Sequence, residues 1–249
     1  MYDREKYKNI EKQLDTILDN VLLLADDLGL KGDLDIFTLV TLLISNGYLS
    51  KDKNYNTVDN VEDLGIYENP IMELGVVPLI KDGCCRNSAS LAKLMLDRFS
   101  IENDITAALR ITDEIDSESL LDISEQIKQE SLCNHAMGIV NINDKRIAFE
   151  VVPLFGANLY SINNNITTRF LSSSNSHLVY NYSPFFEGKK NFSEITPISL
   201  DEQEYILRSC NNTSLIINAN SYLLEEFYEN NKPTIKNIEK DYQKVLVRR

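Results

Sequence analysis

The chain has 249 residues, of which 43% are hydrophobic and 25% charged, and these proportions are typical of a globular protein with a substantial buried core. Its 38 acidic and 25 basic residues give a formal net charge of −13 at pH 7. Because an acidic surface repels nucleic-acid phosphates and anionic lipid headgroups, we expect neither nucleic acid nor a membrane as a partner. The longest apolar runs are also far too short to cross a bilayer.

The first residues and the cysteines bear on the cellular compartment. The N-terminus leads into a charged helical pattern rather than the apolar core of a secretory signal. The 4 cysteines are too few for a disulfide framework in a chain of this size. Both observations favour a cytoplasmic protein. Cys84, Cys85, Cys133 and His135 lack the spacing typical of zinc ligands, so we expect no metal site and no other cofactor.

Helical periodicity dominates both ends of the chain. Apolar residues recur every three or four positions over residues 3–29, where Gly29 makes a plausible stop, and again over residues 33–45. From residue 199 to the end the pattern is helical once more. Residues 48–82 look irregular, because polar clusters and two prolines interrupt them, and we expect a long loop that wraps the surface there.

The middle of the chain combines one helix with several strands. Residues 86–99 have the apolar spacing of a helix, whereas residues 114–130 form an acidic segment that is helical or irregular, and residues 157–176 form a polar loop. Strand patterns occur at residues 106–112, 134–142, 146–152 and 177–182. Helices therefore flank a strand-rich centre, which predicts an α+β fold rather than alternating βαβ units.

Cys85 lies where the central helix begins. Cys85, Ala89, Ala92, Leu96 and Phe99 form one stripe of that helix, and the stripe must be buried against the sheet. Cys85 then lies at the N-terminal edge of the core-facing side. Free backbone N–H groups and the positive end of the helix dipole favour a thiolate at this position. The sequence therefore offers Cys85 as a candidate nucleophile.

His135 and Glu150 fall on two consecutive strands joined by a tight polar turn. A two-residue turn at Asn143 and Asp144 puts Met137 opposite Glu150, and Glu150 then shares a face with His135. A three-residue turn would put Glu150 on the other face. In the two-residue register the carboxylate would orient the imidazole, and the imidazole would activate the thiol.

Each of these residues also has a structural interpretation. Cysteine is among the most buried residue types, a histidine at a strand start is often an ordinary polar residue, and Glu150 could be solvated. In that last case Asn134 or Asn141 would orient the imidazole instead. His177 also begins a strand, but no nucleophile is near it in the sequence. The combination of thiol, imidazole and carboxylate on these elements favours catalysis.

Gly83-Cys84-Cys85-Arg86-Asn87, with the alanine-containing helix that follows, resembles the Gly-x-Cys-Arg-(Asp/Asn) nucleophile motif of the transglutaminase-like superfamily. Asn134-His135-Ala136 resembles the histidine strand of that superfamily. Glu150 lies where the next strand of the superfamily carries an aspartate, and the chain has no Trp, which many members place near the site. The resemblance covers roughly residues 75–155, about a third of the chain.

The resemblance implies a papain-like α+β core, with the nucleophile helix packed on an antiparallel sheet and helical flanks. Residues 1–48 and 186–249 would be helical segments packed on a core of residues 49–185 as one domain. A Cys-His-acid site of this kind forms a thioester with a glutamine, peptide or other amide carbonyl. We therefore expect a peptidase, amidase or transglutaminase-type transferase that acts on a protein or peptide through Cys85, His135 and Glu150.

A catalytically silent protein-binding module on the same fold is the alternative, since the superfamily includes transglutaminases, peptidases, peptide deglycosylases and silent binding domains. In an enzyme, the backbone N–H of Cys85 would be one donor to the oxyanion. Alkylation of the thiols across pH would separate the two possibilities, because only an activated thiolate reacts quickly near neutrality.

Overall fold

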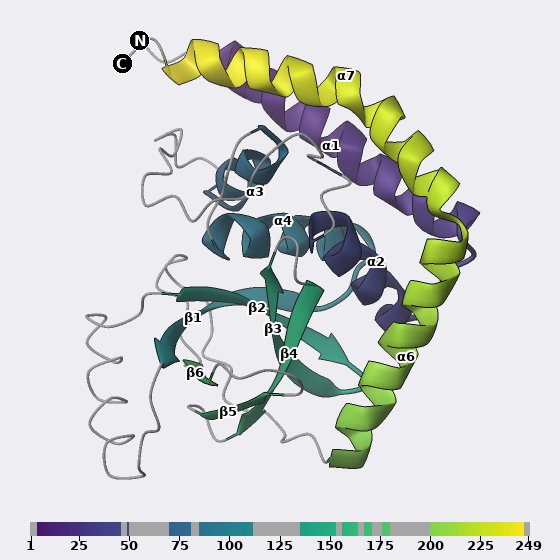
Figure 1. The fold of residues 1–249 in the computed structure, drawn as a ribbon. Helices are drawn as coiled ribbons and strands as arrows, with labels where there is room; N and C mark the ends of the chain where they lie inside the picture. The colour runs from purple at the N-terminus through teal and green to yellow at the C-terminus, as the bar shows by residue number, and fades with distance from the viewer. Residues whose placement is uncertain are drawn as a thin grey trace.

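The chain folds into layers of helices on one side of a closed antiparallel sheet (Figure 1). The computed structural model describes residues 4–45, 49, 70–80, 85–111, 135–152, 156–163, 167–170, 176–179 and 200–246. Its helices are α1 (Arg4–Asp27), α2 (Asp33–Ser45), α3 (Pro70–Ile80), α4 (Cys85–Arg98), α6 (Leu200–Ala219) and α7 (Ser221–Leu246). Its strands are β1 (Asn103–Ile111), β2 (His135–Ile142), β3 (Lys145–Val152), β4 (Gly156–Asn163), β5 (Thr167–Phe170) and β6 (Ser176–Val179). The fold is α+β, as the sequence predicted.

Figure 1 shows how the layers are stacked. α1 and α7 run side by side across one side of the molecule, α2, α3 and α4 lie beneath them, and α4 covers the sheet. α6 runs along the edge and packs against α2. Buried apolar side chains from each of the described helices and from β2 and β3 form one continuous core cluster. The predicted segment boundaries near residues 48 and 185 therefore divide elements that share a core, and these boundaries stay a prediction.

α1 ends at a glycine, as the sequence predicted. Gly29 has a φ of 69°, in the left-handed region. The backbone N–H of Leu30 donates to the carbonyl of Ala25 and that of Gly29 to the carbonyl of Asp26, both at 2.9 Å. These two bonds define a Schellman motif, which satisfies carbonyls that the last helical turn leaves without partners. The reversal directs the chain into α2.

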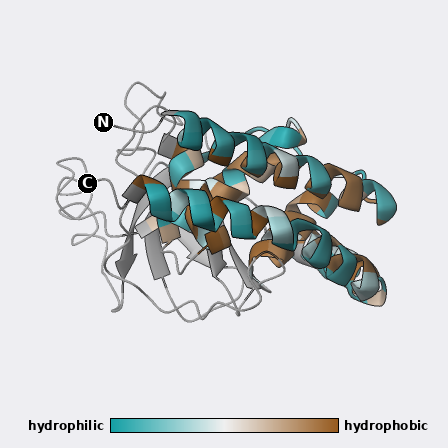
Figure 2. Cartoon of the chain, turned by 90° about the horizontal axis from the view of Figure 1, so that it is seen from above, coloured by the Kyte–Doolittle hydropathy of each residue, from teal (hydrophilic) through white to brown (hydrophobic). Residues whose placement is uncertain are grey.

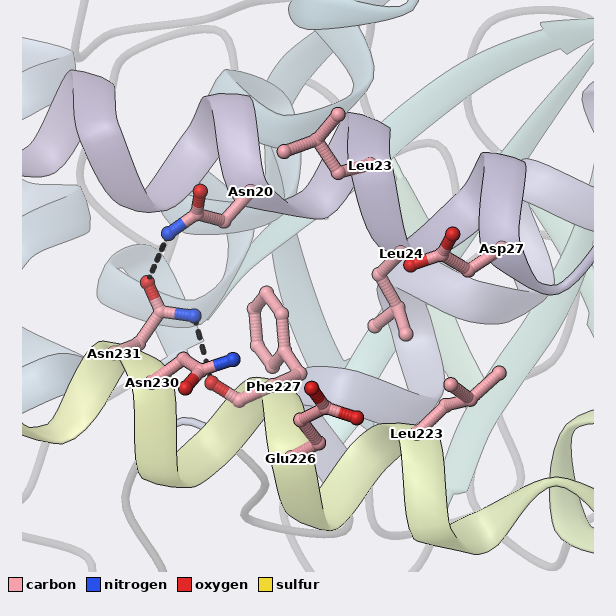
Figure 3. A pocket seen from close by; sticks show the side chains of 9 residues that line it. All are labelled: Asn20, Leu23, Leu24, Asp27, Leu223, Glu226, Phe227, Asn230 and Asn231. Atoms are coloured by element: carbon pink, nitrogen blue, oxygen red, sulfur yellow. Dashed lines mark hydrogen bonds between the residues drawn. The ribbon is translucent and has the colours of Figure 1, made fainter.

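The packing of α1 against α7 joins the two ends of the chain. Figure 2 shows hydrophilic and hydrophobic residues on different sides of these long helices. Within the interface, the Nδ2 of Asn20 donates to the Oδ1 of Asn231 at 2.8 Å, and the Nδ2 of Asn231 donates to the carbonyl of Phe227 at 2.8 Å (Figure 3). Buried polar groups need such partners.

In the described part of the chain, no helix is long and apolar enough to span a membrane.

The sheet is antiparallel throughout and closes on itself, because β6 pairs with both β5 and β1. The β2–β3 hairpin turns at Asn143 and Asp144, whose φ values are 52° and 60°. Two successive left-handed residues are typical of the type I′ turn that suits a tight hairpin. Ile142 pairs with Lys145 across this turn. The predicted two-residue turn is therefore confirmed.

Two predictions of irregular structure were wrong. Within residues 48–82 the structure contains α3, whose described side chains are buried on nearly all sides. A helix that is apolar all round has no hydrophobic period, and the prolines at positions 70 and 78 suggested a loop. Within the supposed loop 157–176 lie most of β4 and all of β5. β4 is rich in asparagine and serine, and its ladder with β3 outweighs that low strand propensity.

Other boundaries differ by a few residues or by one break. The first strand starts at Asn103, earlier than predicted, and the C-terminal helical pattern is divided at Asn220 into α6 and α7. The N–H of Leu223 donates to the carbonyl of Asn220 at 2.9 Å as the second helix begins. The acidic segment 114–130 lies outside the described residues.

Candidate functional site

Cys85 is the first residue of α4, so the prediction that it lies in the first turn of a helix is confirmed. It is partly buried, is not in a disulfide, and packs against a small cluster made of Ala89, Ile105 and Ala136. Ala89 is one turn along the predicted stripe, and its small side chain lets the sheet approach closely. Cys85 and Ala89 of the predicted stripe therefore lie against the sheet, at Ile105 of β1 and Ala136 of β2.

The sulfur of Cys85 contacts the strand that carries the predicted base. The backbone N–H of Ala136 donates a hydrogen bond to the Sγ of Cys85, with a nitrogen–sulfur distance of 3.3 Å. Ala136 directly follows His135, which is the first residue of β2. The helix start and the strand start that the sequence singled out are therefore in direct contact.

The direction of this N–H group locates the sulfur more closely. The N–H of Asn141 donates to the carbonyl of Glu102, on the β1 side of β2, at 2.8 Å. Since N–H groups alternate in direction along a strand, the N–H of Ala136 points to the β3 side. The β2–β3 ladder, however, ends at the pair Gly138–Phe149. The N–H of Ala136 lies just past the end of the β2–β3 ladder. If the ladder continued, this N–H would donate to a carbonyl of β3, but here it donates to the sulfur of Cys85.

Glu150 immediately follows this last pair. It lies in β3, where it pairs with Asn158 of β4. Extended by one residue, the β2–β3 register puts position 150 opposite Met137, as the two-residue turn requires. Cys85 therefore contacts β2 at the place where the strands of His135 and Glu150 separate. The side chains of His135 and Glu150 lie outside the described part of the structure, so their contact stays a prediction.

α3 also packs beside the thiol, and this helix was not predicted from the sequence. Ile71 packs against the cluster that contains Cys85. Farther along, a Cβ on Gly75 would lie 2.5 Å from the Cδ1 of Leu94 and 3.3 Å from the backbone nitrogen of Leu91, so α3 and α4 approach closely there. A continuous apolar run between two polar segments was the available signal for this buried helix.

Cys210 is the other cysteine that the structure describes, and its surroundings differ. It lies on α6 facing α2, and burial raises the pKa of its thiol above the ordinary value. The nearby charge of Asp35 raises this pKa further, while a hydrogen bond with Thr38 partly opposes the shift. The Oγ1 of Thr213 donates to the Oδ1 of Asp35 at 2.6 Å in the same interface. These features suit a structural thiol rather than a nucleophile.

Cys84, Cys85, Cys133 and His135 have no ligand spacing in the sequence, and the absence of a metal there stays a prediction. Among the described residues, no group of three or more histidine, cysteine or acidic side chains is arranged to hold a metal ion. Cys84 and Cys133, two of the nominal ligands considered in the sequence, lie outside those residues.

The chain matches no protein-family model, no curated protein and no solved structure. The resemblance of residues 83–87 and 134–136 to the transglutaminase-like motifs therefore stays a prediction. What the site can do follows from its own geometry.

Proposed function

We propose that this protein is a transglutaminase-like cysteine hydrolase or acyltransferase with a papain-like core. Cys85 attacks the amide carbonyl of a protein or peptide, His135 transfers the proton, and Glu150 orients the imidazole. One observation carries the proposal: the sulfur of Cys85, at the start of α4, lies 3.3 Å from the backbone nitrogen of the residue after His135. This contact brings the thiol to the strand start that carries His135, and activation requires the imidazole nitrogen itself to lie within hydrogen-bond reach of the sulfur.

The surroundings of Cys85 support a negatively charged sulfur. The first turn of α4 presents backbone N–H groups and the positive end of its dipole to the thiol. The N–H of Ala136 adds a direct hydrogen bond to the sulfur. Hydrogen bonds to the charged form of a group favour that form. Both effects act on the atom that must be nucleophilic.

The proposed reaction has two steps. In the first, the thiolate of Cys85 forms a bond to the carbonyl carbon, the carbon–nitrogen bond breaks, and the amine leaves with a proton from the imidazolium of His135. In the second, water or an amine attacks the thioester carbon, His135 removes a proton from the attacking group, and the carbon–sulfur bond breaks to release the thiolate of Cys85. The backbone N–H of Cys85 is the proposed donor to the oxyanion.

One observation favours the alternative of a silent protein-binding module. Ala136 packs with Cys85, and strand alternation assigns position 135 to the other face, with Met137 and Ile139. However, an N–H of a strand points within the plane of the sheet, so a sulfur that accepts it lies beside the strand rather than above one face. The proposal therefore requires the imidazole of His135 to reach around the strand start to this sulfur.

The proposal is tested by a substrate screen. A peptide library is incubated with the protein in the presence and absence of a primary amine, and mass spectrometry detects cleaved, deamidated or amine-linked products. Cys85→Ala should abolish every product that the wild-type protein forms, because it removes the nucleophile. Cys210→Ala is the matched control and should retain the activity. Products that persist in Cys85→Ala would assign the chemistry to another residue, and a wild-type protein without products would favour the binding module.

Glu150→Gln should retain the fold and slow the alkylation of Cys85 at neutral pH at least tenfold. A positioned general base contributes a rate factor of about 10²–10⁴, and we expect the variant to lose part of that factor. The amide keeps the size of the side chain but does not stabilise the imidazolium as a carboxylate does. Glu150→Asp should preserve part of the rate. The unfolding midpoint in urea and the alkylation rate are measured for both variants.

An unchanged rate in Glu150→Gln would remove Glu150 from the site. Of the two asparagines that could replace it, Asn141 is already engaged, since its Nδ2 donates to the Oε2 of Glu102 at 2.9 Å. Asn141 also lies at the far end of β2 from His135. Asn134 would then be the residue to substitute next.

A further inference from the structure

We propose that Asn87 is a positioning residue for Cys85, because its amide replaces a backbone N–H that Pro78 removes from the neighbouring helix. The proposal rests on the proposed function, since it concerns how the nucleophile is held. Asn87 follows Cys85 by two residues in α4, whereas Pro78 lies inside α3. The link between them is a single carbonyl group, that of Leu74.

The chemistry of α3 creates the need for this amide. In an α-helix the N–H of residue 78 would donate to the carbonyl of residue 74, but a proline has no N–H. The Nδ2 of Asn87 donates to the carbonyl of Leu74 at 3.0 Å. Asn87 is completely buried, with an exposed fraction of 0%. A buried amide from α4 thus provides a donor where α3 cannot provide its own.

The position of this bond relates it to the thiol. It joins α3 to the first turn of α4, the turn that begins with Cys85. The close approach of α3 and α4 at Gly75 is a second contact, made against Leu91 farther along α4. Of these two contacts, the bond of Asn87 is nearer to Cys85 along the helix. It therefore fixes the end of α4 from which the sulfur reaches Ala136.

A fixed helix end matters because the sulfur depends on one directional contact. Its hydrogen bond with the N–H of Ala136 already has a nitrogen–sulfur distance of 3.3 Å, and a small rotation or shift of the first turn would lengthen it. Reacting groups that are displaced by about 1 Å can lose a hundredfold in rate. Loss of the Asn87 amide should therefore change the chemistry of Cys85 as well as the stability of the fold.

The first test is a double-mutant cycle in urea unfolding, with Asn87→Leu, Pro78→Ala and the double variant. Leucine has a similar size but donates no hydrogen bond, and alanine at position 78 restores the helix's own N–H. We expect Asn87→Leu to lower the unfolding midpoint strongly when Pro78 is present and much less when alanine replaces it. Equal effects in the two backgrounds would overturn the link. If Asn87→Leu alone does not fold while the double variant does, that rescue supports the link, whereas failure of both overturns it.

The second test follows the iodoacetamide alkylation of Cys85 across pH. We expect Asn87→Leu to slow it about tenfold at pH 7 and to move its pH profile toward the alkaline side, because the thiolate loses its contact. Asn231→Leu is the matched control, since Asn231 is a buried asparagine at 1% exposure whose hydrogen bonds join Asn20 and Phe227 in the α1–α7 interface. It should destabilise the fold and leave the profile unchanged. The same profile in both variants would reduce Asn87 to a structural role.

The two proposals fail in different ways. A wild-type Cys85 profile like that of an unperturbed cysteine would overturn the proposed function, even if Asn87 and Pro78 are coupled in the unfolding cycle. An activated wild-type profile that Asn87→Leu leaves unchanged would overturn the positioning role and leave the proposed function intact.

Discussion

Iodoacetamide at pH 7 should alkylate Cys85 before Cys84, Cys133 and Cys210, and His135→Ala should slow the reaction of Cys85 at least tenfold. Only the thiolate reacts, and the helix start and the N–H of Ala136 both favour a thiolate at Cys85. An imidazole beside the thiol would increase that fraction further by accepting its proton. Peptide mapping by mass spectrometry after short exposures gives the rate of each thiol.

Cys210 provides the internal comparison for this experiment. Burial raises the pKa of its thiol, so at pH 7 a smaller fraction is ionised than in an ordinary cysteine. Its alkylation should therefore require a higher pH than that of an ordinary cysteine, whereas that of Cys85 should level off at a lower pH. In urea all four thiols should react at similar rates, because unfolding removes these differences. If Cys84 or Cys210 is modified first in the folded protein, the nucleophile has been assigned wrongly.

The features that were predicted from the sequence depend on local chemistry. Gly29 ends α1 because glycine adopts a positive φ without strain, and that preference does not depend on the rest of the fold. Asn143 and Asp144 form a two-residue turn for a similar reason, since asparagine and aspartate tolerate left-handed backbone angles. The register of the hairpin follows from this turn. Cys85 begins α4 at the end of an amphipathic stripe.

The features that were not predicted depend on the tertiary environment. α3 is stabilised by burial on nearly all sides, and the missing N–H at Pro78 is compensated by Asn87, which lies outside α3, 13 residues after Leu74. β4 forms a strand because β3 offers it a ladder, although its own residues have low strand propensity. Neither partner can be recognised from the segment alone.

The candidate site also combines features that the sequence predicts with contacts that only the folded structure shows. Thiol, imidazole and carboxylate could be singled out by residue type and order, but the contact between Cys85 and the N–H of Ala136 could not. That contact requires the β2–β3 ladder to end at Gly138 and Phe149, so that the N–H is left for the sulfur. The end of a ladder is set by packing around it rather than by a local pattern. We therefore expect both the stability of the fold and the reactivity of Cys85 to depend on this last pair of the ladder.

Gly138→Ala should destabilise the protein by about 3 kcal/mol or more, at the upper end of what overpacking a core usually costs. A Cβ at this position would lie 2.3, 2.5 and 2.8 Å from three ring carbons of Phe149. The ring cannot easily retreat, because it is 1% exposed and packs edge-on against Phe37 with a centroid distance of 5.0 Å. Urea unfolding measures the loss. In a Phe149→Leu background the same substitution should cost clearly less, since the ring is then absent.

The same substitution should also slow the alkylation of Cys85, because Gly138–Phe149 is the last pair before the N–H of Ala136 that the sulfur accepts. Gly29→Ala is the control. It should cost only about 1 kcal/mol from its left-handed backbone, since nothing lies within 4 Å of the added Cβ, and should leave Cys85 unaffected. If Gly138→Ala and Gly29→Ala have equal effects on stability, the close contact with Phe149 is wrong. If Gly138→Ala is destabilising but Cys85 reacts at the wild-type rate, the end of the ladder does not control the thiol.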